Sequence, residues 1–530
     1  MDETEIARVG RLIKRIQRAA DTLRHFPSRI RVLAHNDSDG LASGAIITKA
    51  LTREGKEFQL SFHKQLTKAV LHDLTTEPNR LFLFLDFGSG MITTIQETLL
   101  ARDRVPSAVG IIADHHLPQG DVYSENLIHL SPHDFDITEN ISGAGMTYLL
   151  ARAMNPENRE LAELAIIGAI GDSQMGSVGP DWTLFGLNKE ILKDAVSTGK
   201  IRQDKGLRLW GRYTRPLHRA LQYSVDPYIP EVSGNEDHAI AFLQEIGIDH
   251  RKPGGFRCLA DLSEDEQRTL ADAIIKERVT KNIDHPDHIF GDVYDLVERD
   301  EYRDANEFTT LLNACGKLGN PGLGIALCLG DPTAPPLMKK VLASYRKEIG
   351  EGIRCFYANQ ETLLLERDKG LYVHARDLIG EHIISNVIST VHKAGVLPEK
   401  PVFALVHAAD GAIKVSARAS EALVAQGLNL GKILAAAAAK AGGEGGGHRG
   451  AAGALIPIAN EHMLINSIEE ILMSLGGSPK PVPEPIAATP DTYDRRKQDR
   501  GEGSTPREES RPRQKVERKG LVRYFGAEDV

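Results

Sequence analysis

Short apolar segments without polar alternation constrain the fold of this chain more than any other feature. The runs Leu81 to Leu85 and Val109 to Ala113 are too short for helices, and no polar residue interrupts them. Strands of this kind are buried on both faces, as in a parallel sheet covered by helices. Segments with helical spacing alternate with them, for example Leu41 to Glu54. The pattern predicts an α/β fold with a parallel sheet.

The length of 530 residues is typical of several domains. We expect a first α/β domain over residues 1–190, which opens with an amphipathic helix, and a mostly helical inserted region over 191–345. A smaller α/β domain follows over 346–475, with a strand expected near Thr362 to Leu365 and a helix from about Glu421 to Ala441. Residues 476–530 are rich in Pro, Ser, Glu and Arg and poor in apolar residues, which predicts a disordered tail.

The charge balance, with 64 Lys and Arg against 73 Asp and Glu, gives a net charge of −9. This balance argues against a broadly basic protein that coats nucleic acid. No apolar run approaches the ~20 residues that span a bilayer, and the first residues carry no apolar secretory segment. We therefore expect a cytoplasmic protein with no membrane partner.

Acidic and histidine side chains follow the ends of four apolar segments. They are His35, Asp37 and Asp39 after Arg31 to Ala34, Asp86 after Leu81 to Leu85, Asp114, His115 and His116 after Gly110 to Ala113, and Asp172 after Ala165 to Ile170. In an open α/β sheet, the crevice beyond the carboxyl ends of the strands is the ligand site, so these segments are expected to meet there.

Carboxylates gathered in one crevice repel one another unless a cation neutralises them. Mixed carboxylate and imidazole ligands suit Mn²⁺ and similar divalent ions rather than metals that prefer thiolates. Two ions ~3.5 to 4 Å apart are the usual arrangement for phosphoester hydrolysis. The alternative for single members is structural, since Asp37 or Asp39 could cap the helix that begins near Leu41.

The four segments resemble motifs I to IV of the DHH phosphoesterase superfamily. A second resemblance, to the GGGHxxAAG signature of the companion DHHA1 domain, lies in Gly445 to Gly453, preceded by Val415-Ser416-Ala417-Arg418. The two signatures occur in the family's order over residues 30 to 460. The segments Arg215 to His218 and Leu311 to Gly316 are similar to those inserted in archaeal RecJ-like nucleases, including the GINS-associated nuclease.

The resemblance implies two divalent metal ions, with Mn²⁺ favoured and Mg²⁺ as the alternative. It assigns one ion to His35, Asp37 and Asp86, and the other to Asp39, Asp86, His115 and Asp172, so that Asp86 bridges them. Asp114 would orient a histidine, and His116 would face the scissile phosphate. These roles agree with a water molecule, activated by two cations, that attacks phosphorus.

The glycine cluster around Gly446 and Gly447 is a candidate nucleic-acid clamp. Successive glycines let the backbone approach a phosphate closely, and Arg418 and His448 would add charged contacts, with Ser416 beside them in the same signature. The alternative is a flexible turn after the preceding helix.

Seven basic residues between Lys200 and Arg219, with Trp210 and Tyr213 among them, have two interpretations. They could form a stripe for phosphates with aromatic platforms for bases, or the solvated face of a helix.

The last residues place Leu521, Tyr524 and Phe525 in an otherwise polar tail. They resemble a peptide that binds the sliding clamp (PCNA), although Arg518 stands where such peptides usually carry Gln. Such a segment would fold on its partner.

These observations favour a metal-dependent exonuclease that hydrolyses single-stranded DNA or RNA in replication and repair. One alternative is a replisome scaffold associated with GINS, helicase and clamp components, with secondary nuclease activity. Another is a phosphodiesterase for small nucleotides or oligoribonucleotides. A relative in the eukaryotic replicative helicase keeps the fold and has lost the ligands, so the intact ligand set favours an enzyme.

Overall fold

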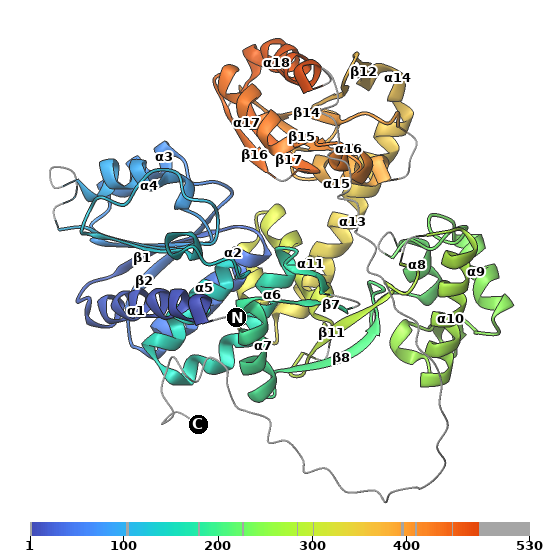
Figure 1. Cartoon of the computed structure of the whole chain (residues 1–530), viewed down its shortest axis with the longest axis horizontal. Coiled ribbons are helices and arrows are strands. Elements are labelled where there is room, and N and C mark those ends of the chain that lie inside the picture. Colours follow the sequence, from blue (N-terminus) through green and yellow to red (C-terminus); the bar gives the residue numbers. More distant parts are fainter. Residues whose placement is uncertain are drawn as a thin grey trace, which may run out of the picture. The chain divides into compact units, whose positions relative to one another are not determined.

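The computed structural model describes residues 3–475 except 102–104, 106, 179–180, 225–226, 284, 300, 394–396, 409–410 and 448. These residues form two compact units, 3–354 and 355–475 (Figure 1). The predicted tail, with Leu521, Tyr524 and Phe525, lies outside the described residues, and so does His448. Within the described part, no helix is long and apolar enough to cross a lipid bilayer.

A five-stranded parallel sheet forms the centre of the first unit, as the apolar runs predict. Its strands lie in the order β2-β1-β3-β4-β5. They are β1 (Ile30–His35), β2 (Phe58–His63), β3 (Leu81–Leu85), β4 (Val109–Ala113) and β5 (Leu127–Leu130). Neighbouring strands pair in register, with Ala34 beside Leu85 and Leu85 beside Ala113, so β1, β3 and β4 end at the same level.

Helices cover both faces of this sheet, which explains why β3 has no exposed residue. Phe82, Phe84 and Ile112 pack on one side against α3 (Lys68–Thr76) and α4 (Ile92–Ile95). The opposite face contacts α2 (Ser38–Arg53) and α5 (Gly143–Met154). α1 (Glu3–His25) packs on α5, and α6 (Ala162–Gly171) packs on α2 and α5.

The inserted region begins after α7 (Leu187–Ser197) with a long antiparallel ribbon. The ribbon pairs β8 (Ile201–Leu207) with β11 (Phe290–Leu296), and a shorter hairpin of β6 (Met175–Val178) and β7 (Asp181–Leu184) packs beside β11. The alternative of a solvated helix across residues 200–219 is therefore wrong for its first half, because Ile201–Leu207 is a strand.

A small helical cluster lies between the two ribbon strands in sequence and has its own apolar core. It contains α8 (Leu217–Gln222), α9 (Glu236–Glu245), the hairpin of β9 (Arg251–Lys252) and β10 (Gly255–Phe256), and α10 (Glu264–Thr280). After the ribbon, α11 (Ala305–Lys317) packs on α2 and α6, and α12 (Pro321–Cys328) packs on α2. The chain then enters α13 (Ala334–Ala358).

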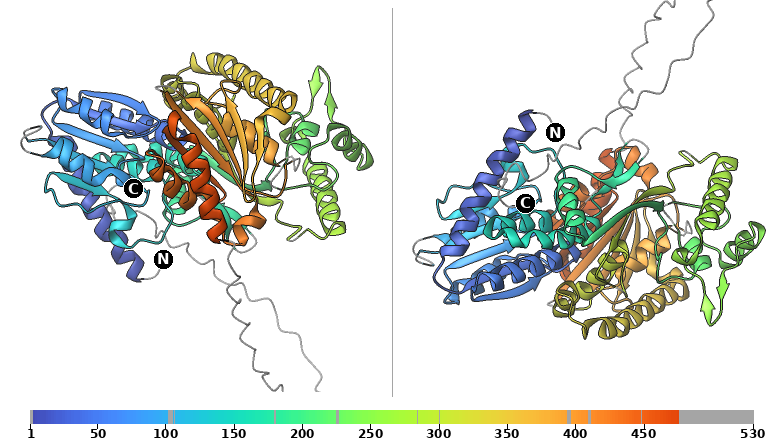
Figure 2. Two further views of the ribbon diagram at one scale, coloured as in Figure 1. Left: turned by 90° about the horizontal axis from the view of Figure 1, so that it is seen from above. Right: turned by 90° about the horizontal axis from the view of Figure 1, so that it is seen from below.

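The second unit is a six-stranded mixed sheet with the order β12-β13-β14-β15-β17-β16. Its strands are β12 (Leu364–Glu366), β13 (Leu371–Arg376), β14 (Val402–Ala408), β15 (Ala412–Arg418), β16 (Glu444–Gly447) and β17 (Ala451–Pro457). Only β13 and β14 are parallel neighbours. α17 (Leu430–Lys440) and α18 (Glu461–Leu475) enclose the core on one face (Figure 2), and α15 (Ile384–Lys393) contacts β14 and β15.

Two local predictions for this unit need correction. The helix expected over Glu421 to Ala441 is interrupted, since α16 (Glu421–Ala425) ends before Gly427, whose φ of 99° breaks the helix. The strand expected near Thr362 begins later, at Leu364, because α14 (Gln360–Leu363) precedes it.

Candidate metal centre

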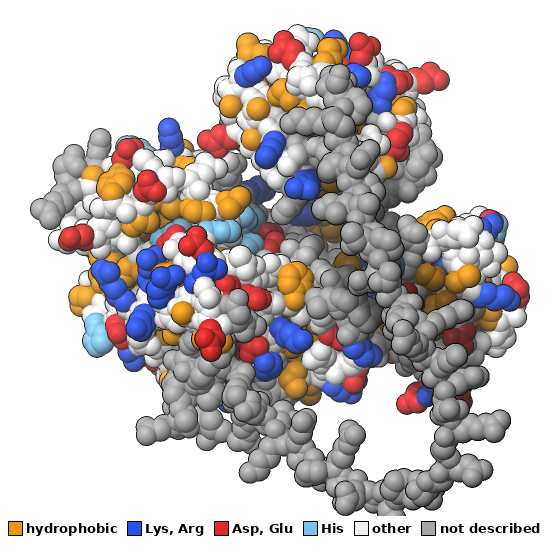
Figure 3. Space-filling view, viewed as in Figure 1, with side chains coloured by type: hydrophobic (Ala, Val, Ile, Leu, Met, Phe, Trp, Pro, Cys, Tyr) orange, Lys and Arg blue, Asp and Glu red, His pale blue; other side chains and the backbone are white. Residues whose placement is uncertain are grey.

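The carboxyl ends of β1, β3 and β4 bring the predicted side chains together. His35 is the last residue of β1, Asp86 follows β3, and Asp114 to His116 follow β4. The fourth segment differs from expectation, because Asp172 is the C-cap of helix α6 rather than the residue after a strand. A cluster of histidine side chains reaches the surface of the first unit (Figure 3).

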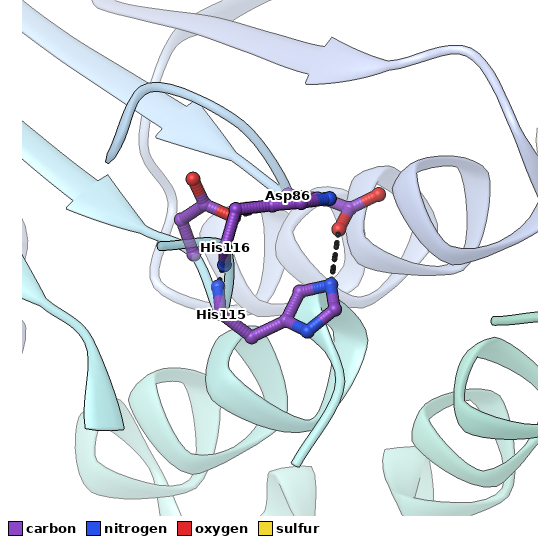
Figure 4. A group of neighbouring side chains, drawn as sticks. Asp86, His115 and His116 are labelled. Carbon is purple, nitrogen blue, oxygen red and sulfur yellow. Dashed lines mark hydrogen bonds and ion pairs between the residues drawn. The ribbon is translucent and has the colours of Figure 1, made fainter. Parts of the chain in front are cut away.

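Two groups of possible metal ligands share this site, and Asp86 lies between them. In the first, His35 Nδ1 is 2.9 Å from Asp37 Oδ2 and 3.5 Å from Asp86 Oδ2. In the second, His115 Nε2 is 3.5 Å from Asp86 Oδ1 and from Asp172 Oδ2, and 3.9 Å from Asp39 Oδ2. Figure 4 shows the His115 ring turned toward the Asp86 carboxylate. Three sets of these side chains have the spacing that could hold an ion: His35, Asp37 and Asp86; Asp39, His115 and Asp172; and Asp86, Asp114, His115 and His116.

Buried polar atoms without a hydrogen-bond partner give an independent test of fit. Among the described residues they include both carboxylate oxygens of Asp86, Nδ1 of His35 and Nε2 of His115. Buried polar groups normally have a partner, so such atoms require an explanation. Cations between them would satisfy all four, and the donor set of carboxylates and imidazoles suits hard or borderline divalent ions.

The pKa values of the carboxylates also indicate that positive charge would be stabilising at this site. Burial raises the pKa of Asp39 well above its usual range, and the neighbouring charge of Asp86 raises it further. Burial also raises the pKa of Asp172. Burial alone would raise the pKa of Asp86 too, but the imidazoles of His115 and His35, each 3.5 Å away, outweigh it and lower this pKa. Carboxylates this close together cannot all stay ionised without positive charge beside them.

Local backbone geometry aims Asp86 and Asp39 into the site. Asp86 has a φ of 61°, a conformation that costs a non-glycine residue about 1–2 kcal/mol and that clusters at functional sites. Asp39 lies in the first turn of α2 and accepts hydrogen bonds from the N–H groups of Gly143 (2.7 Å) and Ala144 (2.9 Å) at the start of α5. The helix N-terminus favours negative charge there.

Asp37 has the capping role considered from the sequence, and its position is compatible with the ligand role as well. It is the N-cap of α2, where its Oδ1 accepts a hydrogen bond from Gly40 N at 3.0 Å. Its Oδ2 is the oxygen that lies near His35. The capping interpretation and the ligand interpretation therefore use different oxygens of one carboxylate.

Asp114 and His116 form a pair beside the ligand groups. The fully buried Asp114 accepts hydrogen bonds from His116 Nδ1 (2.7 Å) and from the N–H groups of Ser89 (2.9 Å) and His115 (2.8 Å). The hydrogen bond with Asp114 raises the pKa of His116. Burial would raise the pKa of Asp114, but the bond with His116 lowers it. His116 is 55% exposed, so its other ring nitrogen is open to a ligand.

Several supporting residues carry no signal that sequence reasoning detected. Gln174 donates to Asp172 Oδ2 at 2.8 Å, and Asn188 on α7 donates to Gln174 Oε1 at 2.6 Å. Ser38 N donates to Asn313 Oδ1 at 3.1 Å. Asn313 belongs to the segment Leu311 to Gly316, which was singled out as an inserted motif without a role.

The candidate clamp in the second unit is more regular than expected. Gly446 pairs with Gly453 and Gly447 with Ala452, so the glycines form the edge strand β16 rather than an open turn. They also permit close packing, because a Cβ on Gly445 would lie 2.7 Å from Leu434 O, on α17. Gly446 has open space around it.

Ser416 and Arg418 lie on β15 of the same sheet. Ser416 is buried, and its hydroxyl is 2.8 Å from that of Ser385. The Arg418 guanidinium donates to Ser389 Oγ at 2.7 Å and to the carbonyl oxygen of Ala417. Its hydrogen bonds within the described residues are to hydroxyl and carbonyl groups, and burial lowers its pKa.

The fold and the site define a two-unit α/β protein with a carboxylate and histidine centre at the end of a parallel sheet. Residues 29–169 match the DHH family N-terminal domain, 209–288 the DHH-CID domain and 371–474 the DHHA1 domain. A protein of Methanocaldococcus jannaschii with no characterised function is 31% identical over 477 residues, which cover 88% of this chain and 97% of the relative. The chain belongs to the RecJ-like DHH/DHHA1 phosphoesterases.

Similar proteins of known activity are more distant in sequence. The single-stranded-DNA-specific exonuclease RecJ of Thermus thermophilus is 28% identical over 231 residues, 41% of this chain and 32% of RecJ. The structure of Thermus thermophilus RecJ with Mn²⁺ matches 87% of this chain and 55% of RecJ, with a TM-score of 0.52 and 18% identity. Cdc45 from Entamoeba histolytica matches 88% of this chain and 99% of its own, with a TM-score of 0.57 and 11% identity. These two structures share the fold.

Proposed function

We propose that the protein is a metal-dependent phosphodiesterase that hydrolyses single-stranded DNA or RNA as an exonuclease. The observation that carries the proposal is the set of unpartnered buried atoms on Asp86, His35 and His115. A carboxylate whose two oxygens each face a different histidine is suited to bridge two cations. The sequence likeness to RecJ, which covers 41% of this chain, supports the substrate class.

The ligand assignment follows the two groups. His35, Asp37 and Asp86 would hold one divalent ion, and Asp39, Asp86, His115 and Asp172 the other. Mn²⁺ is the favoured ion, supported by the donor types and by its presence in the RecJ structure of similar fold. When bound, such ions supply Lewis acidity and lower the pKa of a water molecule.

The chain's own residues position and stabilise the reacting phosphate. Hydrolysis adds water across a P–O bond, so negative charge grows on the phosphate oxygens and on the departing oxygen. His116, whose pKa is raised by its hydrogen bond with Asp114, would in its protonated form place a positive charge and an N–H donor at the open side of the centre. Asp114 itself would not contact the phosphate, because it is fully buried and bonded to backbone N–H groups.

A time course on 5′- and 3′-labelled single-stranded DNA and RNA with Mn²⁺ tests the proposal. The wild-type protein should shorten the strands from one end, and Asp86→Asn should be inactive. Asp73→Asn is the matched control, because Asp73 is an exposed carboxylate on α3 of the same unit. Equal hydrolysis by the wild type and Asp86→Asn would overturn the site. A preference for dinucleotides over long strands would point to a small-nucleotide phosphodiesterase.

A replisome scaffold is the second candidate, favoured by the fold shared with Cdc45 over 88% of this chain. In that case GINS or helicase components would bind, and the proposed clamp-binding residues Leu521, Tyr524 and Phe525 would add a contact. Removal of residues 518–530 should then weaken binding to the sliding clamp, and unchanged affinity would dismiss the clamp-binding peptide. Retention of the complete ligand set favours the enzyme over a purely structural role.

A further inference from the structure

The basic stretch from Lys200 to Arg219 is largely neutralised by acids that are distant in sequence. Five of its seven basic side chains make ion pairs: Lys200 with Glu298, Arg202 with Asp204 and Asp295, Lys205 with Asp292, Arg212 with Asp295 and Asp304, and Arg219 with Glu236. Arg208 stacks on Trp182 and donates to the carbonyl oxygen of His288. Among the described residues, the side chain of Arg215 is the one of the seven with neither an ion pair nor a hydrogen bond.

Arg215 lies between two aromatic rings instead. Its guanidinium carbon is 3.9 Å from the ring centre of Trp210 and 5.1 Å from that of Tyr223. The turn that brings it there requires a glycine, because Gly211 has a φ of 89° and a Cβ on it would lie 2.4 Å from Arg215 Cβ. Trp210 is itself held by a hydrogen bond from its Nε1 to Thr310 Oγ1 at 3.3 Å. The arrangement is therefore preorganised.

The electrostatic surroundings of Arg215 favour an anion. Burial lowers the pKa of Arg215 to about 10, and the positive charge of Arg346 on α13 contributes to the shift. The carboxylate that acts on Arg215, that of Glu307, is already bound by the Thr214 hydroxyl and by Tyr213 N. The half-buried guanidinium of Arg215 has no ion-pair partner among the described residues, and a phosphate group could neutralise its charge.

Helix α11 connects this place to the candidate metal centre. Thr310, which holds Trp210, and Asn313, which accepts a hydrogen bond from Ser38 N, are three residues apart on α11. Side chains at this spacing lie on one face of a helix, one turn apart. Ser38 lies between the candidate ligands Asp37 and Asp39, so Thr310, which holds Trp210, is one turn of α11 away from the residue that bonds to the start of α2.

We infer that Arg215, Trp210 and Tyr223 form a binding subsite for the backbone and bases of a single nucleic-acid strand. The Arg215 guanidinium would bind a phosphodiester, and the positive charge of Arg346, which acts on Arg215, would add to the attraction. Tyr223, which is 56% exposed, would offer its ring to an unpaired base. The inference rests on the proposed function, and it adds a place where the strand is held beside the point of hydrolysis.

Fluorescence anisotropy with the full-length protein and labelled dT and rU oligonucleotides tests the subsite. EDTA in the buffer prevents hydrolysis, so binding is measured separately from catalysis. Arg215→Gln and Arg346→Gln should each weaken binding by ~10-fold and make the salt dependence shallower by about one phosphate contact. Tyr223→Ala should weaken binding by ~5- to 100-fold through lost stacking.

Arg208→Gln is the matched control, because it also removes an arginine from the face of a tryptophan, and its affinity should stay within about twofold of wild type. If Arg215→Gln does not fold, Arg346→Gln and Tyr223→Ala decide, since both side chains are exposed. Wild-type affinity and salt dependence in these variants would overturn the subsite. An equal loss for a labelled mononucleotide would overturn the strand assignment in favour of a free-nucleotide site.

Failure of the subsite and failure of the proposed function remain distinguishable. Arg215-dependent binding without Mn²⁺-dependent hydrolysis would retain the subsite and reject the hydrolase. If hydrolysis depends on Asp86 but the affinity for oligonucleotides does not change in the Arg215 and Arg346 variants, the proposed hydrolase is supported and the subsite is rejected.

Discussion

Asn313 accepts a hydrogen bond from the backbone N–H of Ser38, although 275 residues separate the two in sequence. The bond joins α11, in the inserted region, to the start of α2, where Asp37 is the N-cap and Asp39 lies in the first turn. Close packing reinforces it, since a Cβ on Gly316 would lie only 1.6 Å from Asn36 O. The inserted region is thus held by α11 against the first ligand segment.

Asn313→Ala should loosen the start of α2, which carries Asp37 and Asp39, and so weaken metal binding. Residues that orient metal ligands typically contribute 10- to 100-fold to metal affinity or activity, so we expect a loss of about that size in Mn²⁺ affinity measured by isothermal titration calorimetry. Asn306→Ala, two turns earlier on the same helix, is the control and should bind Mn²⁺ like the wild type. Equal affinities for both variants would remove the positioning role of Asn313.

Gly143→Ala should damage the centre through a steric clash. The added Cβ would lie 2.4 Å from Asp86 Oδ1, and both Asp86 and the start of α5 are buried. Overpacking of this kind costs about 1–3 kcal/mol, so thermal unfolding should shift down and hydrolysis should fall. Gly10→Ala on α1 is the contrast, because nothing lies within 4 Å of its Cβ. That variant should be more stable by about 0.5–1 kcal/mol, and a Gly143→Ala protein of wild-type stability would contradict the packing described here.

The convergence of His35, Asp86 and His115 could be predicted from sequence because each follows a short apolar strand of one parallel sheet. The sheet order itself places the ends of β1, β3 and β4 together. Asp172 could be predicted from its motif although it follows a helix and not a strand. The spacing of motifs identifies the residue but does not indicate which kind of element precedes it.

Other parts of the site could not be predicted, for a physical reason. Gln174, Asn188 and Asn313 are polar residues whose roles depend on contacts made across 14 to 275 residues. The basic stretch gave a misleading pattern in the same way, because its partners Asp292 and Asp295 lie on β11, about 90 residues away. A run of basic residues is visible in the sequence, but the acidic residues that pair with it after folding are not.

Asp172→Asn should separate metal binding from the stability of the metal-free protein. Burial raises the pKa of Asp172, so its ionised form is unfavourable in the folded state without a cation. The neutral amide keeps an oxygen for the Gln174 donor. In EDTA the variant should unfold at a temperature equal to or above that of the wild type. At a Mn²⁺ concentration of about 100 Kd the wild type should gain about 2.7 kcal/mol, and the variant should gain much less. An equal gain would exclude Asp172 as a ligand.

The pH dependence of metal-induced stabilisation should follow from His115. Burial alone would lower the pKa of His115, but Asp86 outweighs this and raises it to about 10 in the metal-free protein. The raised pKa stabilises the metal-free fold fully below the unfolded value of about 6.5, and this contribution is lost as pH rises toward 10. A metal ion needs the neutral imidazole, so protons compete with it over the same range.

We therefore expect the increase in unfolding temperature caused by Mg²⁺ to grow from pH 6.5 to pH 9. The unfolding temperature of the wild type in EDTA should fall over that range, relative to His115→Asn in EDTA as the control. Calorimetric titrations in buffers of different ionisation enthalpy should detect proton release on metal binding at pH 7. A metal-induced increase that is constant across the range, without proton release, would contradict the role of His115 as a ligand.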